Sequence, residues 1–194
     1  MSDDRTMPET MSENDVIELL IAQHGMIRDL FDEVEQAPPA KRGEAFTRLV
    51  RLLAVHETAE EEIVHPYARA TLDGGDGIVD DRLAEENEAK QLLQHMDKAG
   101  PDAPDFTDNL LALRAAVEAH ARSEERYEFA KLRAETSVAQ RRALAAGVKA
   151  AEALAPTHPH PGTESATKNV LMGTPVAMMD RARDVIRQAL GKKD

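Results

Sequence analysis

Residues 55–69 read VHETAEEEIVHPYAR, a helix-forming segment that carries an unusual number of ionisable side chains. His56 and Glu60 lie four positions apart, so a helix places both on one face. That face also carries Leu53 and Ile63, which turns the pair toward a hydrophobic core. A solvated helix surface and the wall of a metal site both explain the segment, and the rest of the chain decides between them.

Four long segments show helical periodicity, at residues 15–36, 39–72, 78–98 and 105–135, with Pro66 expected to kink or break the second. Connectors that are short or rich in Gly and Pro predict an all-α, up-down four-helix bundle over residues 14–135. Residues 1–13 are expected to form a flexible N-terminus. Residues 136–194 are expected to form C-terminal helices near 137–154 and 175–190, joined by a linker rich in Pro and His.

The composition of the chain disfavours some partners and limits which residues could bind a metal. The net charge of −12 disfavours a nucleic-acid partner, because an acidic chain repels phosphate backbones. With no cysteine, any metal must be held by His, Asp, Glu or Tyr, which suits iron, manganese or zinc. No apolar run approaches the roughly 20 residues of a membrane span, and the polar N-terminus does not look like a signal peptide, so we expect a cytoplasmic protein without a membrane partner.

Each of the four apolar stripes is interrupted at mid-helix by side chains that could bind a metal or carry charge. A buried carboxylate is costly unless it is paired or bound to a metal. Several such groups in one core layer therefore need a common compensation, which a metal cluster supplies. In chain order the interrupting residues are His24, His56, Glu60, Glu86, Lys90, His120 and Glu124.

The pattern of the second helix recurs in the fourth. His56-x-x-x-Glu60-Glu61 returns sixty-four residues later as His120-x-x-x-Glu124-Glu125. Spacing of i, i+4 lets an imidazole and a carboxylate share one metal or bridge two. Two such helices form an approximately two-fold cage for two metals, which His24 and a group from the third helix would complete.

This order of motifs resembles the hemerythrin-like (HHE cation-binding) domains over about residues 14–135. The resemblance implies two non-haem iron ions bridged by two carboxylates and an oxo or hydroxo group. The residues that match the family's ligand positions are His24, His56, Glu60, His120 and Glu124.

Glu86 stands where the family usually has a histidine, and we expect it to be an added carboxylate ligand. A carboxylate there favours ferric iron and weakens the case for reversible oxygen carriage. An ordinary pairing of Glu86 with Lys90 on a helix surface explains the residue about as well. Glu85 or Asn87 takes the role if the register slips by one residue.

The His65-Pro66 pair and the C-terminal helix are similar to actinobacterial hemerythrin-like proteins, which are associated with peroxide and nitric oxide chemistry. The resemblance implies a protein that binds or turns over a small oxidant, namely hydrogen peroxide, O2 or nitric oxide, in a catalase- or peroxidase-like reaction. A module that binds, stores or senses O2, nitric oxide or iron without turnover stays open as the alternative. A homodimer through the C-terminal helices is a further expectation.

Several residues near the motifs have two interpretations. His65 lies nine residues after His56, on the opposite side of a regular helix, so we expect it beside the metals rather than on them unless Pro66 changes its direction. Tyr67 and Tyr127 are expected to be core aromatics, with a hydrogen bond to a ligand or direct metal binding as the alternative. Four further acids are expected on the solvated side or next to the ligands: Glu57, Glu61, Glu62 and Glu125.

Overall fold

The computed structural model describes residues 14–155, and every regular element in that range is helical. The first two long helices are α1 (Val16–Gln36) and α2 (Pro39–Ala59). Helix α2 continues through η2 (Glu60–Val64), a π-helical turn wider than a turn of α-helix, into α3 (His65–Thr71). The next two are α4 (Gly75–Ala99) and α5 (Phe106–Ser123), and α5 continues through η3 (Glu124–Glu128) into α6 (Phe129–Glu135). The last described helix is α7 (Val138–Glu152).

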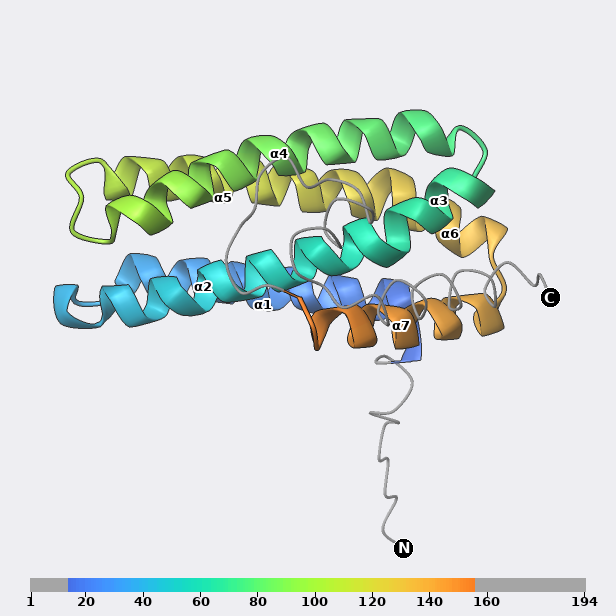
Figure 1. Cartoon of the computed structure of the whole chain (residues 1–194), viewed down its shortest axis with the longest axis horizontal. Coiled ribbons are helices and arrows are strands. Elements are labelled where there is room, and N and C mark those ends of the chain that lie inside the picture. The colour runs from blue at the N-terminus through green and yellow to red at the C-terminus, as the bar shows by residue number, and fades with distance from the viewer. Residues whose placement is uncertain (1–13, 156–194) are drawn as a thin grey trace, which may run out of the picture.

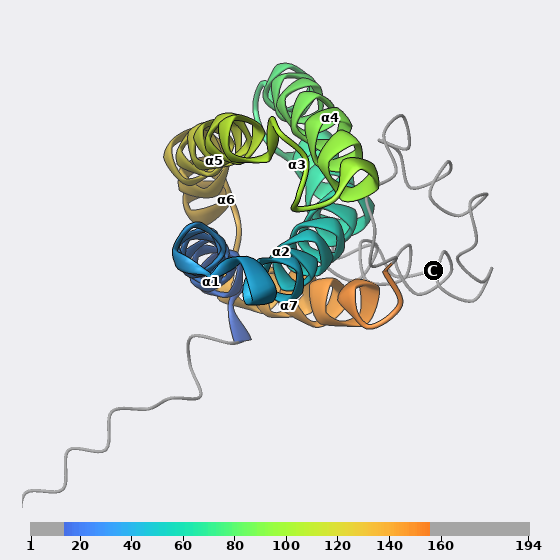
Figure 2. The same cartoon turned by 90° about the vertical axis from the view of Figure 1, so that its left-hand side faces the viewer.

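These elements form an up-down four-helix bundle, as the sequence predicts. Figure 2 shows the helices α1, α2, α4 and α5 end-on around a common axis, with α3 and α6 extending α2 and α5 along the bundle. Helix α7 lies outside the ring against α1 and α2 (Figure 1). The predicted helix at 175–190, its Pro/His-rich linker and the predicted dimer contact lie outside the described residues.

Local signals in the sequence account for the helix ends. Asp15 caps α1 by accepting a hydrogen bond from the backbone N–H of Ile17 at 3.0 Å. Ser137 and Gln140 form a capping box at the start of α7. In the turn before α4, Gly74 has a φ of 70°, and a Cβ on Gly75 would lie 2.3 Å from the backbone oxygen of Ala68. Glycine is therefore required at both positions.

The hydrophobic core is divided into two clusters, and the polar residues lie between them. One cluster, at the α7 end, includes Leu20, Ile63 and Leu144. The other, at the end where α1 meets α2, includes Ile27 and Leu49. His24 falls between Leu20 and Ile27 on α1, and each of the other three long helices crosses the same layer. The interruptions seen in the apolar stripes are thus one continuous polar layer.

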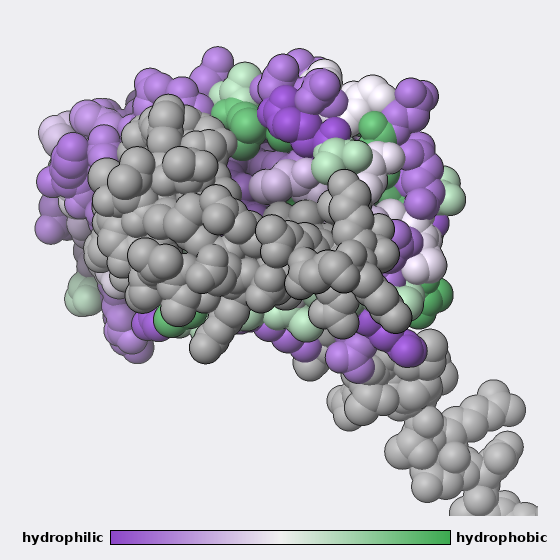
Figure 3. Space-filling model, turned by 45° about the vertical axis from the view of Figure 1, so that its right-hand side comes forward, coloured by the Kyte–Doolittle hydropathy of each residue, from purple (hydrophilic) through white to green (hydrophobic). Residues whose placement is uncertain are grey.

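The surface of the described residues is mostly hydrophilic. On the part of one face that Figure 3 leaves visible, hydrophilic side chains predominate and hydrophobic ones occupy small areas between them. The large exposed hydrophobic residues are Met26, Leu111, Tyr127, Val138 and Leu154. None of the helices within residues 14–155 combines the length with the apolar character that crossing a membrane requires.

Candidate metal centre

Six of the predicted ligand residues meet in the polar layer, and they form two overlapping groups of four. Within each group the ligand atoms lie within 4.8 Å of one another, and all six residues are at most 5% exposed. Glu60 and Glu124 belong to both groups, so each of these carboxylates can serve two metal positions. The first group adds His24 and His56, and the second adds Glu86 and His120.

The three histidines present the same ring nitrogen to the shared glutamates. His24 Nε2 lies 3.2 Å from Glu124 Oε2, and His120 Nε2 lies 3.4 Å from the same oxygen. His56 Nε2 lies 3.4 Å from Glu60 Oε2. All three Nε2 atoms therefore face the centre of the layer.

The other ring nitrogen of each histidine is held from outside the cluster. His56 Nδ1 is 2.7 Å from Gln23 Oε1, and His24 Nδ1 is 2.9 Å from Glu125 Oε1. His120 Nδ1 is 3.1 Å from Glu85 Oε2. An acceptor at Nδ1 places a ring hydrogen there, so in the neutral ring Nε2 keeps the free lone pair that metal-binding histidines need. Glu85 thus contacts the candidate ligand His120 from outside the cluster and does not take the ligand position of Glu86.

Many polar atoms that face the centre have no hydrogen-bond partner among the described residues. They include both carboxylate oxygens of Glu60 and of Glu124, and the Nε2 atoms of His24 and His120. Leaving buried groups without partners costs free energy for each one. A metal pair bound between Glu60 and Glu124 would engage all of these atoms at once, so the residues fit the group that the resemblance implies.

The two wide turns begin at the two shared glutamates. In η2 the backbone N–H of His65 donates to the carbonyl of Glu60, five residues earlier, and in η3 the N–H of Phe129 donates in the same way to Glu124. Such turns insert one residue into a helix and often occur at functional sites. The chain stays helical through Pro66, contrary to a break there. Because η3 has no proline, Pro66 is not the common cause of the two turns.

The extra residue in η2 rotates the start of α3 and brings His65 into the site. His65 is 2% exposed, and its Nε2 lies 2.6 Å from Glu86 Oε1. Its Nδ1 lies 3.3 Å from Glu128 Oε1. Burial lowers the pKa of His65, but Glu86 and Glu128 outweigh it and hold the pKa well above its usual value. His65 therefore faces inward, where a regular helix would direct it away, and it holds Glu86.

The same rotation in η3 makes the core prediction for Tyr127 wrong. Tyr127 is 53% exposed, with the Arg126 guanidinium 5.5 Å from its ring centre. Glu128, which the sequence analysis missed, is fully buried in its place. The signal was available as the five-residue gap between Tyr127 and Leu132, which a regular helical stripe does not allow. Tyr67 is a buried core residue, as predicted, and among the described residues it makes no hydrogen bond to the six cluster residues.

Of the two places expected for Glu57, Glu61 and Glu62, the solvated surface is wrong, because they are 5%, 3% and 4% exposed. Lys90, which is 7% exposed, compensates for part of this buried charge. Its Nζ pairs closely with Glu61 and lies 3.8 Å from Glu57 Oε2.

Lys90 Nζ also lies 3.6 Å from Glu86 Oε2, so Glu86 pairs with Lys90 inside the protein and not on its surface. Glu125 lies at the edge of the site, with 34% of its side chain exposed, and bonds His24.

Electrostatics separate the carboxylates. Burial and the neighbouring Glu124 raise the pKa of Glu60 well above its usual value. Burial alone would raise the pKa of Glu124 as well, but His120 and His24 hold it well below. Burial is likewise overcome at Glu86, where His65 and Lys90 lower the pKa to about 2. The carboxylates of Glu60 and Glu124 lie so close together that both cannot be ionised cheaply without a cation between them.

Histidine ionisation differs across the cluster too. Burial and the neighbouring His24 lower the pKa of His56 to about 3, so its ring is neutral. At His120 burial lowers the pKa, but Glu124 overcomes this and holds it well above the usual value. Outside the six, burial and the neighbouring Glu86 raise the pKa of Glu57 to about 8.

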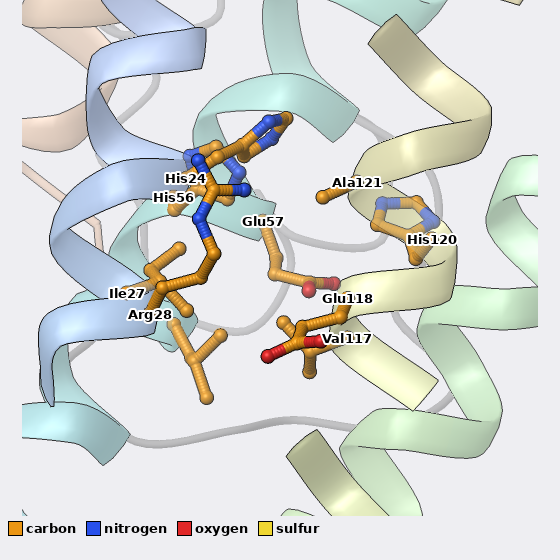
Figure 4. A pocket seen from close by; sticks show the side chains of 10 residues that line it. His24, Ile27, Arg28, His56, Glu57, Val117, Glu118, His120 and Ala121 are labelled. Atoms are coloured by element: carbon orange, nitrogen blue, oxygen red, sulfur yellow. The ribbon is translucent and has the colours of Figure 1, made fainter. Parts of the chain in front are cut away.

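A small pocket leads to the cluster between α1, α2 and α5. His24, His56 and His120 are among the residues that line it, and Figure 4 shows the Glu57 carboxyl group extending toward His120. The rest of its lining combines the apolar side chains of Ile27, Leu53, Val117 and Ala121 with the charged side chains of Arg28, Glu57 and Glu118. The room open to a water-sized molecule is about 10 Å³, close to what one such molecule needs. The pocket therefore admits only small molecules.

The family model described as the hemerythrin HHE cation-binding domain matches residues 15–132 of the chain. The chain belongs to this family. The match covers the bundle and all six clustered residues, so this part of the chain is a cation-binding domain.

The HHE chain is similar to a curated protein and to a solved structure. A DNA nickase from Nostoc sp. is 33% identical over 145 residues, which cover 74% of this chain and 40% of that protein. The HHE chain thus spans less than half the length of this curated relative. A crystal structure of a hemerythrin HHE cation-binding domain-containing protein from Mycobacterium kansasii, an Rv2633c homologue, superposes with a TM-score of 0.63. It is 19% identical, and the match covers 87% of this chain and 98% of that one, which supports the fold alone.

Proposed function

We propose that the HHE chain holds two iron ions, bridged by Glu60, Glu124 and an oxo or hydroxo group, and that it turns over hydrogen peroxide. His24 and His56 would hold one iron, and His120 and Glu86 the other. One observation carries this proposal. The two groups of four residues share Glu60 and Glu124, and the carboxylate oxygens and ring nitrogens that face the centre lack hydrogen-bond partners among the described residues. A single metal would leave one of the two groups unused.

The donor set supports iron and turnover. Three imidazoles and three carboxylates form a hard, electron-rich ligand set, which stabilises iron in the ferric state. Reversible binding of O2 needs ferrous iron, so this ligand set disfavours it. Glu86, with its pKa of about 2, contributes an ionised oxygen to this set. Reversible carriage of O2 is accordingly the less favoured alternative.

When bound, such an iron pair supplies the two-electron redox chemistry of peroxide disproportionation. One hydrogen peroxide takes up two electrons and two protons and becomes two waters, and a second gives up two electrons and two protons and becomes O2. The balance needs no outside reductant. The chain's own residues exclude larger molecules through the pocket, orient the three imidazoles through their Nδ1 partners, and offset buried negative charge with Lys90.

The activity in the name of the Nostoc relative is not carried over to this chain. The match covers 40% of that protein, and a net charge of −12 opposes binding to a phosphate backbone.

The test combines metal analysis with oxygen evolution. The full chain is loaded with ferrous iron in air, desalted, and examined for iron content, near-ultraviolet absorption and O2 release from hydrogen peroxide. We expect two irons per chain and O2 release in the wild type. Glu60→Gln should lose iron and activity together, whereas Glu88→Gln, which changes an exposed glutamate on α4, should match the wild type.

Two results would overturn the proposal. A chain that holds one iron or none after loading would contradict the paired site. A chain that holds two irons, changes its absorption reversibly with O2 and releases no O2 from peroxide would instead be a binding module.

A further inference from the structure

A second pocket lies on the surface between α4 and the η3–α6 segment, outside the metal cluster. It has a volume of about 660 Å³, within the range of roughly 300–1,000 Å³ that small-molecule sites occupy. Its lining includes Ile78 and Arg82 from α4, and Arg126, Tyr127 and Lys131 from the opposite side. The pocket is therefore large enough for a small organic molecule.

The charge of this pocket is opposite to that of the chain. Three cationic side chains, Arg82, Arg126 and Lys131, line it against a single acid, Asp81. The chain as a whole carries a net charge of −12. A local excess of positive charge on such a chain attracts anions to this place in particular.

Arg82 is the buried member of the set and has hydrogen-bonding capacity to spare. It is 6% exposed, and its Nη2 donates to Glu85 Oε1 at 2.9 Å. Its Nε and Nη1 have no hydrogen-bond partner among the described residues. Buried N–H groups without acceptors are costly, and the planar guanidinium fork matches the two oxygens of a carboxylate or phosphate.

We propose that this pocket binds a small organic anion through a carboxylate or phosphate group held by Arg82, Arg126 and Lys131. The anion supplies the acceptors that Arg82 lacks and neutralises the cationic wall. This inference is independent of the reaction proposed for the metal cluster.

The rim of the pocket is suited to the organic part of such a ligand. Tyr127 is 53% exposed, and Arg126 covers its ring at 5.5 Å, so together they offer a flat wall for stacking. Lys131 is held in place by a hydrogen bond from Nζ to the backbone oxygen of Asp73. The exposure of Tyr127, unexpected for the position, acquires a role in this arrangement.

The pocket is connected to the metal cluster by a short chain of hydrogen bonds. Glu85 accepts from Arg82 through Oε1 and holds His120 Nδ1 through Oε2 at 3.1 Å. An anion on Nε and Nη1 shares the charge of the guanidinium with Glu85 and so weakens the charge-assisted bond that Glu85 accepts from Nη2. Occupation of the pocket should therefore change how firmly Glu85 holds His120.

Isothermal titration of the full chain at low salt, with and without iron loading, tests the site. The probes are inorganic phosphate, succinate and phenyl phosphate, which separate phosphate from carboxylate recognition and test the aromatic wall. We expect saturable binding of at least one probe, with phenyl phosphate tighter than phosphate. The double variant Arg126→Gln/Lys131→Gln should weaken it about tenfold or more, because charge-assisted contacts are lost.

The matched control is Arg122→Gln, which removes an exposed arginine of α5 outside the pocket. It should bind the probes as the wild type does. Arg82→Met should weaken binding at least as much as the double variant, and if this buried change prevents folding the double variant still decides the matter.

Absence of binding for all three probes would overturn the proposal, as would equal weakening by Arg122→Gln. The link to the cluster has its own readout: saturation with the binding probe should shift the near-ultraviolet absorption of the iron-loaded wild type, and an unchanged spectrum would refute the link.

Discussion

Gln23 offers the sharpest test of how the histidines are oriented. Its Oε1 accepts from His56 Nδ1 at 2.7 Å, and its Nε2 donates to Glu152 Oε1 of α7 at 2.5 Å. Burial and the neighbouring His24 lower the pKa of His56 to about 3, so the ring is neutral and carries a single hydrogen. Gln23 holds that hydrogen on Nδ1 and leaves the Nε2 lone pair facing Glu60.

The variant Gln23→Leu removes this control with little change in volume. Glu60 Oε2, 3.4 Å from Nε2, then remains as an acceptor for His56, so the tautomer with its hydrogen on Nε2 gains a partner. That tautomer cannot bind a metal through Nε2. Loss of such outer contacts lowers metal affinity roughly 10–100-fold, which corresponds to about 1.4–2.7 kcal/mol.

The assay is a competition titration of the full chain with cobalt(II) against a chromophoric chelator. We expect two binding phases in the wild type, and we expect Gln23→Leu to weaken the phase of the His24/His56 position while sparing the other. Gln36→Leu, at the exposed end of the same helix, is the control and should behave as the wild type. Wild-type affinity in Gln23→Leu would refute the argument that Gln23 sets the His56 tautomer.

Three further predictions concern charge and metal. Lys90→Met should lower the free energy of unfolding by about 3–5 kcal/mol, because it leaves Glu57, Glu61 and Glu86 buried without their cation. Urea titrations measure this difference. A loss below about 1 kcal/mol would show that these carboxylates become protonated at little cost. Because the pKa of His120 is raised, metal must displace a proton there at and below neutral pH, so apparent metal affinity should fall as pH falls and level off above that pKa. Metal titrations at several pH values check this, and a flat profile would contradict it. Chelation should lower the thermal midpoint, since metal at roughly 1,000 times its Kd stabilises by about 4 kcal/mol, and an unchanged midpoint in scanning calorimetry would argue against metal in this layer.

The bundle and the six clustered residues could be predicted from the sequence because both depend on regular periodicity. Apolar residues three and four apart define the stripes, and a polar residue that interrupts a stripe must face the same core. His24, between Leu20 and Ile27, illustrates this, since it lies where the two hydrophobic clusters separate.

The segments after the shared glutamates could not be predicted in this way, because one inserted residue changes the phase of the helix. The direction of His65, the exposure of Tyr127 and the burial of Glu128 all result from the wide turns. The burial of Glu57 and its acidic neighbours was missed for a different reason. An acid is expected in water unless a cation accompanies it, and Lys90, the cation that does so, comes from another helix.

The two halves of the site are alike in backbone and different in chemistry. His65 and Phe129 occupy equivalent places, each donating its backbone N–H across a wide turn to a shared glutamate. Phe129 stacks on His24, with ring centres 5.8 Å apart and an angle of 11° between the planes. His65 instead bonds Glu86 at 2.6 Å. The imidazole of His24 thus has the apolar ring of Phe129 beside it, and the carboxylate of Glu86 has a hydrogen-bond donor in His65. In each half of the site, the residue after the wide turn suits the side chain that it contacts. Glu86 is therefore matched to its surroundings, which a chance acid on a helix face would not be.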